Sequence, residues 1–183
     1  QVGQANVVTA TRVGANTSIN ATNAAVNITQ IDAGGLVTPL AAFLTFDFDN
    51  LAPVVMLGPV ITQRYAGTFC ISEAADCGGD RYLFGDFEDI TFGQGAALAL
   101  AASTPPFTNV NFFSDVITNL DFHRGVGFSF ANVTPALGET NGSINSFTSS
   151  VSGVFSANVG VVPEPETFAL LMMGLVAVGL ARR

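Results

Sequence analysis

The stretch LTFDFD, residues 44–49, alternates apolar and polar side chains one residue at a time. Successive side chains of a β-strand point to opposite faces of the sheet. The stretch therefore predicts a strand that buries Leu44, Phe46 and Phe48 and leaves the residues between them in water. Phe128-Ser129-Phe130 repeats the pattern. Such strands are typical of an antiparallel sheet with one wet face.

Short apolar runs separated by Gly, Pro, Asn and Asp continue through residues 1–161. Seven of these runs are also predicted as strands: 7–13, 25–31, 54–57, 64–72, 82–92, 109–113 and 147–159. Turn residues lie between them, as at Asn141-Gly142. The alanine-rich residues 96–102 are the exception, because they favour a helix. About eight to eleven strands at this spacing predict a mainly β protein with an antiparallel β-sandwich or jelly-roll-like body, or a barrel.

The chain has 183 residues, and we expect one folded body, residues 1–161, followed by a tail, residues 162–183. Residues 1–30 are uncharged apart from Arg12 and rich in Asn, Thr, Ala and Val. This segment fits a first strand of the body, a flexible arm, or a donor strand that completes the sheet of a neighbouring subunit. The sequence starts at Gln1, without Met, a basic stretch or an apolar run, so we expect that a signal peptide has been removed.

The charge balance limits the partners of the protein. The chain has fourteen acidic residues and six basic ones, all of them Arg, and its formal net charge is −8. A negative field repels phosphate backbones, so nucleic acid is excluded as a partner. Divalent cations and polysaccharides are compatible neighbours.

Cys70 and Cys77 are the two cysteines of the chain. In an exported protein such a close pair predicts a local disulfide, and two free thiols are the alternative. A zinc site would need more ligands, but the single histidine, His123, is distant in the sequence.

The carboxyl-terminal tail has three parts. Val162-Pro163-Glu164-Pro165 predicts a stiff, extended spacer, because prolines restrict the backbone and donate no hydrogen bond. An uncharged apolar run, residues 168–181, follows, and Arg182 and Arg183 end the chain. This order is typical of a membrane anchor whose basic end stays in the cytoplasm. The residues expected to form the anchor are Phe168, Leu170, Leu171, Leu175, Val178, Leu180, Arg182 and Arg183.

The length of the apolar run leaves the final state of the tail open. A helix of about fourteen residues spans roughly 21 Å, less than the ~30 Å of a hydrocarbon core. Such a span suits a temporary hold in the inner membrane better than a permanent one. The alternative is a helix buried inside a soluble domain or between subunits.

The tail resembles the PEP-CTERM sorting tag of Gram-negative bacteria, in which a Pro-Glu-Pro motif precedes an apolar helix and a basic end. Many members carry Trp where this chain has Phe168. The resemblance implies recognition by an exosortase-type membrane protease and delivery to the cell surface or the exopolysaccharide matrix. It is confined to residues 162–183 and implies nothing about the fold of the body.

Candidate chemistry elsewhere is sparse. A nucleophilic triad needs a base, and His123 has no serine motif such as GxSxG to serve, so no catalytic residue is predicted. Oxygen ligands that suit a structural Ca²⁺ occur at Asp47, Asp49, Asp86, Glu88 and Asp89, although an acidic solvated loop is the default interpretation. No other cofactor is expected.

Together these features predict a non-catalytic exported structural protein of the cell surface, the biofilm matrix or an extracellular filament. Self-association into a polymer, by pairing of strand edges, is the expected mode of action. The alternative is a monomeric surface module that binds polysaccharide or another ligand.

Overall fold

The computed structural model describes residues 7–30, 38–103, 109–118, 120 and 124–157. These ranges contain twelve strands and no helix. The strands are β1 (Val8–Val13), β2 (Asn16–Ile28), β3 (Leu40–Asn50), β4 (Val55–Leu57), β5 (Val60–Ala74), β6 (Gly78–Gln94), β7 (Ala97–Ser103), β8 (Asn109–Phe113), β9 (Arg124–Thr134), β10 (Glu139–Thr140), β11 (Ser143–Ile144) and β12 (Phe147–Ala157). The expected carboxyl-terminal helix lies outside the described residues.

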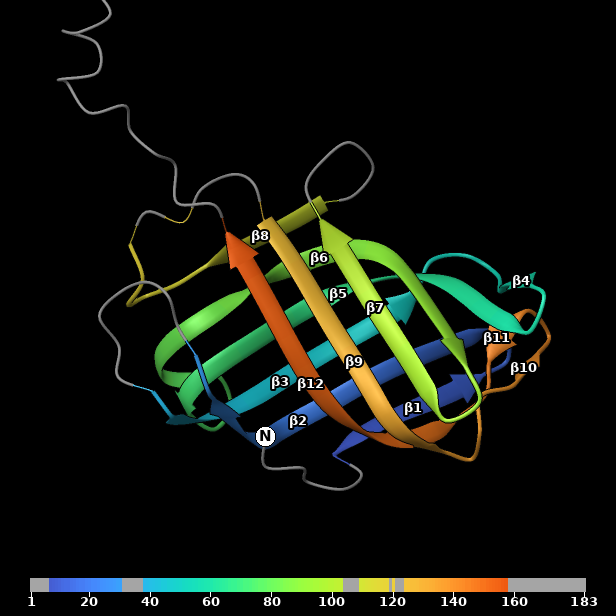
Figure 1. The fold of residues 1–183 in the computed structure, drawn as a ribbon, viewed down its shortest axis with the longest axis horizontal. Helices are drawn as coiled ribbons and strands as arrows, with labels where there is room; N and C mark the ends of the chain where they lie inside the picture. The colour runs from blue at the N-terminus through green and yellow to red at the C-terminus, as the bar shows by residue number, and fades with distance from the viewer. Residues whose placement is uncertain (1–6, 31–37, 104–108, 119, 121–123, 158–183) are drawn as a thin grey trace, which may run out of the picture.

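Eight of the strands close into a barrel-like antiparallel sheet (Figure 1). Their order is β5-β3-β2-β1-β12-β9-β7-β6, and β6 pairs again with β5. The short β4 pairs with the start of β5, and β8 pairs with residues 84–88 of β6. The prediction of a mainly β, antiparallel body is confirmed, and the closed sheet matches the barrel alternative in place of the sandwich or jelly roll.

The closure depends on the two longest strands, β5 and β6. They are paired from Ile61 and Gly93 at one end to Ala74 and Gly78 at the other. This ladder joins the two ends of the strand order, so the sheet avoids the exposed edges that two open sheets would have. The alternation of apolar and polar residues is the same in a sandwich and a barrel, which is why the sequence pattern does not separate the two.

Most of the amino-terminal segment forms strands of the same barrel-like sheet as the rest of the chain. Residues 8–28 form β1 and β2, which pair with each other, and β2 also pairs with β3. In this chain these residues are therefore strands of the barrel. Residues 1–6 lie outside the described part of the chain.

The alanine-rich segment is a strand, contrary to the predicted helix. In β7, Leu98 and Leu100 are buried, and the alanines beside them point outward. β6 and β9 flank β7 on both sides. Alanine has a high intrinsic helix propensity, but burial of the two leucines between two partner strands outweighs that weak preference.

Phenylalanine rings fill the inside of the barrel. Phe46 and Phe48 stack with ring centroids 4.3 Å apart, and Phe128 lies within 6.4 Å of its ring neighbours on several strands. The ring cluster consists of Phe46, Phe48, Phe69, Phe87, Phe112, Phe128, Phe130 and Phe155. Aromatic rings bury large apolar areas and interact specifically at these distances, so the cluster stabilises the closed sheet from within.

Candidate functional site

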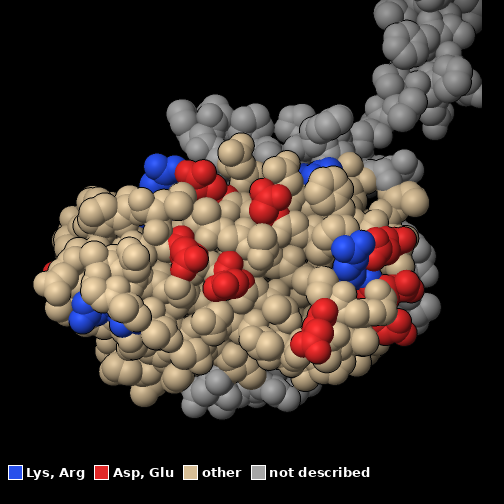
Figure 2. All heavy atoms as spheres, turned by 180° about the vertical axis from the view of Figure 1, so that it is seen from behind, with Lys and Arg blue, Asp and Glu red and all other residues tan. Residues whose placement is uncertain are grey.

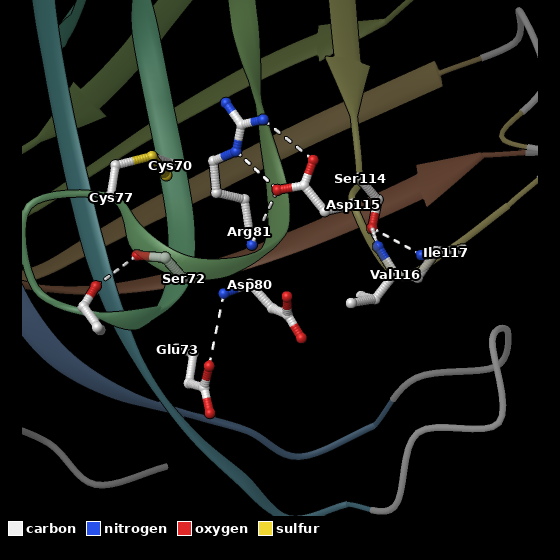
Figure 3. Close-up of polar contacts among 11 residues, drawn as sticks. Cys70, Ser72, Glu73, Cys77, Asp80, Arg81, Ser114, Asp115, Val116 and Ile117 are labelled. Atoms are coloured by element: carbon white, nitrogen blue, oxygen red, sulfur yellow. Dashed lines mark hydrogen bonds and ion pairs between the residues drawn. A yellow bond between two sulfur atoms is a disulfide. The ribbon is translucent and has the colours of Figure 1, made fainter.

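The turn between β5 and β6 carries the disulfide (Figure 3). Cys70 lies in β5 and Cys77 just before β6, with Cα atoms 5.9 Å apart. The predicted disulfide is confirmed, and no free cysteine remains. Two register shifts in the β5–β6 ladder, on either side of Ser72, accompany this turn. The bond holds the tip of the longest hairpin against its own strand.

An ion pair braces the chain after β8 against the beginning of β6 (Figure 3). Arg81 donates from Nε and Nη2 to the two carboxylate oxygens of Asp115, at 2.8 and 3.0 Å. Two further bonds join the pair: Asp115 N–H donates to Arg81 C=O, and Arg81 N–H donates to the Asp115 carboxylate. These bonds lower the pKa of Asp115 below its usual value, chiefly through the Arg81 side chain. The Arg81 guanidinium also lies 3.7 Å from the Phe84 ring centroid.

Ser114 completes this brace. Its hydroxyl accepts hydrogen bonds from the N–H groups of Val116 and Ile117, at 3.2 and 2.8 Å. The hydroxyl is therefore an acceptor in a turn, with no histidine or carboxylate in contact to activate it among the residues that the structure describes. Ser114, Asp115 and Arg81 form a structural junction, and nothing in their geometry provides a nucleophile with a base.

The candidate calcium ligands lie on two strands that are not neighbours. Asp47 and Asp49 point outward from β3, and Asp86 and Glu88 point outward from β6. Because β5 lies between them, the two pairs are roughly 10 Å apart. Figure 2 shows acidic side chains spread over this side of the molecule with uncharged surface between them.

Other groups already engage several of these carboxylates. The Ser18 hydroxyl donates to Asp49, and Glu88 forms an ion pair with Arg64. Asp89 accepts a hydrogen bond from the N–H of the next residue, Ile90. In the described ranges no three His, Cys, Asp or Glu side chains come together in a way that could hold a metal ion. The two acidic pairs are distant in the sequence, and strand pairing leaves β5 between them.

A buried polar cluster, which the sequence analysis missed, closes the opposite end of the barrel. Gln63 Oε1 accepts hydrogen bonds from the Tyr65 hydroxyl, at 3.1 Å, and from the N–H of Ile144, at 3.2 Å. The hydroxyls of Thr17 and Ser143 lie 2.6 Å apart beside them. The signal for this cluster is the run Ile61, Gln63, Tyr65, in which polar groups occupy inward positions of β5.

This cluster fastens the β10–β11 hairpin to the end of the barrel. Burial raises the pKa of Tyr65, so the phenol keeps its proton and remains a hydrogen-bond donor. The side-chain amide of Gln63 also donates to Ala52 C=O, at 2.9 Å. A buried polar network with its partners satisfied fixes one arrangement of the chain, and here that arrangement is the closed end.

The predicted sorting and anchor residues, Val162 to Pro165 and Phe168 to Arg183, lie outside the described residues, as does His123. In the described part of the chain, no helix is both long enough and apolar enough to span a bilayer. Information about the tail comes instead from comparison with known families. Residues 161–183 match the family model of the PEP-CTERM protein-sorting motif.

The chain carries a PEP-CTERM sorting motif. The motif implies export to the cell surface or the extracellular space of a Gram-negative bacterium. It also implies processing by an exosortase, which is a membrane protein. No curated protein and no solved structure matches the chain. The match confirms the resemblance seen in the sequence and is limited to the tail.

Proposed function

We propose that this PEP-CTERM protein is a non-catalytic structural component of the cell surface or its matrix. The observation that carries the proposal is the ring cluster inside the barrel. Small barrels that bind a ligand keep room for it in their interior, whereas here phenylalanine side chains from β3, β5, β6, β8, β9 and β12 occupy that space. A filled, disulfide-pinned barrel is suited to a role as a rigid building block.

Surface aromatic residues favour the second candidate, a module that binds polysaccharide. Phe113 in β8 is 53% exposed and Phe92 in β6 is 44% exposed, and both lie on the outer wall. The apolar face of an exposed aromatic ring can pack on a sugar ring. Against this candidate, the Arg124 guanidinium lies 5.3 Å from the Phe113 ring centroid and competes for the ring.

The test of the first candidate uses the producing bacterium with its own gene deleted. Complementation with the wild-type chain should restore the protein to the surface or matrix and restore matrix cohesion, measured by rheometry. His123→Ala should restore both equally, because the role needs no general base. Failure of this variant to restore cohesion, with an unchanged circular dichroism spectrum and amount, would overturn the non-catalytic role.

A sorting variant provides the control for location. Replacing Pro163, Glu164 and Pro165 by alanine removes the spacer of the motif, and we expect the chain to remain in the envelope fraction. Thr167→Ser, next to the motif, should leave the distribution unchanged. Immunoblots of the envelope, surface and medium fractions measure the result. Equal distributions of the triple variant and the wild type would contradict sorting through this motif.

A further inference from the structure

One side of the barrel presents a sheet surface without charge or bulk. The outward-facing residues of β7, β9 and β12 form rows across the three strands, as their register shows: Ala97, Ala131 and Ser150; Ala99, Ser129 and Ser152; Ala101, Gly127 and Val154; Gly125 and Ser156. We call this the uncharged face. Its largest side chain, Val154, is 75% exposed. β12, β9 and β7 lie in front in Figure 1.

The charged side chains of the described residues lie outside these rows, and the one that the three strands carry, Arg124 at the start of β9, lies against the rings of Phe112 and Phe113. The acidic side chains are carried by β3, β5, β6, the turn between β5 and β6, the end of β8, and β10. Figure 2, which views the molecule from the side opposite to Figure 1, shows several of them. Surfaces of soluble proteins normally mix charges of both signs over every face. A sheet surface of three strands without any charge lacks the usual protection against association.

A second, independent feature borders the same face. The ladder between β1 and β12 ends at Val8 and Ser149. Beyond this point, residues 150–157 of β12 pair with β9 on one side and with no described strand on the other. Ser149, where the ladder ends, is fully buried, and its hydroxyl has no partner within the described residues. Within the described part of the chain, this stretch of β12 has a neighbouring strand on the side of β9 alone.

We propose that the uncharged face is the surface on which a second copy of this chain docks. The net charge is the reason to expect that a second copy docks through this face. Two molecules of charge −8 repel each other through most orientations and approach best where neither carries charge. An isologous contact brings the same patch of each copy together, and alanine, serine and glycine allow two sheets to approach closely.

The size of the face predicts the strength of the contact. Three strands and seven residues cover about 14 Å by about 20 Å, or roughly 300 Å². A stable dimer buries about 800 Å² on each partner. The contact is therefore weak between two free molecules and becomes effective where many copies are held close together. This inference rests on the proposed structural role and names its partner.

The test compares charge added to two opposite faces. Ser152→Asp places a carboxylate in the middle of the uncharged face, and Thr68→Asp places one on the exposed outer side of β5, between Asp47 and Asp86. The full chain in mild detergent is studied by sedimentation velocity over a broad dilution series. We expect weak self-association of the wild type and of Thr68→Asp. Ser152→Asp should raise the dissociation constant at least about tenfold, because like charges then face each other.

Cross-linking provides a second measurement. Both native cysteines are in the disulfide, so an introduced cysteine is the one free thiol. Ser129→Cys lies on the middle strand of the uncharged face and should form an intermolecular disulfide on mild oxidation far faster than Thr68→Cys. A monomeric wild type at every dilution, equal effects of the two aspartates, or equal cross-linking of the two cysteines would overturn the proposal.

The outcome also separates this inference from the proposed function. If the two faces behave alike while deletion of the gene still weakens the matrix, the structural role stands and the docking surface is wrong. Association that is unaffected by Ser152→Asp but lost when the apolar tail is replaced would assign the contact to the tail and likewise overturn the proposal. If deletion leaves the matrix unchanged, the structural role itself fails.

Discussion

Asn23 in β2 and Asp76 in the β5–β6 turn hold each other by two reciprocal hydrogen bonds. The Asn23 amide donates to the Asp76 carboxylate at 2.8 Å, and the Asp76 N–H donates to the Asn23 amide oxygen at 2.7 Å. Thr45, on the strand between them, also donates to Asn23, at 3.2 Å. Both Asn23 and Asp76 have positive φ angles, 53° and 57°. The pair thus ties the disulfide turn to a bulge of β2.

Two substitutions of Asn23 should separate the contribution of its hydrogen bonds to stability from that of its backbone conformation. Asn23→Gly loses the side-chain bonds but tolerates a positive φ, and should lower the free energy of unfolding by about 1 kcal/mol. Asn23→Ala loses the same bonds and adds left-handed strain, so it should cost about 1 kcal/mol more. Urea unfolding measures both values. Equal losses for the two variants would show that the backbone at Asn23 is not strained.

Removal of the disulfide tests the same region through the unfolded state. Cys70→Ser combined with Cys77→Ser opens a short loop, so the free energy of unfolding should fall by about 2 to 3 kcal/mol. The matched comparison is the wild type under reducing conditions, which should show the same loss. A double variant as stable as the oxidised wild type would mean that Asn23 and Asp76 already hold the turn.

The neighbouring strand β3 passes very close to Gly67 of β5, which leaves no room for a larger residue. A Cβ added there would lie 2.1 Å from the backbone oxygen of Asp47 and 2.7 Å from the Cα of Phe48. Because backbone atoms cannot move aside cheaply, Gly67→Ala should destabilise the barrel by about 3 kcal/mol or more.

Gly127 is the matched control for this prediction. It also lies in a central strand, but a Cβ there would meet its nearest atoms at 3.8 and 3.9 Å. Gly127→Ala should therefore change stability by less than about 1 kcal/mol, with a small gain from the lower entropy of the unfolded chain. Thermal unfolding of the two variants provides the comparison. Similar melting temperatures would contradict the crowding at Gly67.

The sequence predicted some elements of the fold for clear physical reasons. The alternation at residues 44–49 lies in β3, and the strand expected at 109–113 matches β8. Periodicity shows which side chains face inward, whereas closure also needs the ladder between β1 and β12, whose partners, such as Val8 and Ser149, are distant in the sequence. The helix predicted for residues 96–102 was wrong because alanine favours a helix, whereas the buried leucines stabilise the strand through tertiary packing, which the local sequence does not show.

Some parts of the candidate site could likewise be predicted from the sequence, and others could not. The disulfide followed from two nearby cysteines, and the sorting motif followed from a contiguous pattern that the family comparison confirms. The acidic residues were predicted as a cation site from their oxygen ligands, but the sequence does not show that β5 lies between Asp47 and Asp86. The uncharged face combines residues from three strands, and only the register between those strands brings them together.

The buried phenol of Tyr65 makes stability depend on alkaline pH. Burial raises its pKa in the folded chain above the ordinary value of about 10, so the folded state keeps a proton that the unfolded state releases. This stabilisation is complete below about pH 10 and is lost as the pH rises above it, by at most about 1.4 kcal/mol per pH unit. Tyr65→Phe removes this dependence.

The variant should therefore show opposite effects in the two pH ranges. At neutral pH, Tyr65→Phe loses the 3.1 Å hydrogen bond to Gln63 and should lower the free energy of unfolding by about 1 kcal/mol. Between about pH 10 and 12, wild-type stability should fall more steeply than that of the variant, because only the wild type has this phenol to ionise on unfolding. Urea titrations at several pH values measure both slopes. Parallel slopes would show that Tyr65 titrates normally and that the closed end of the barrel admits water.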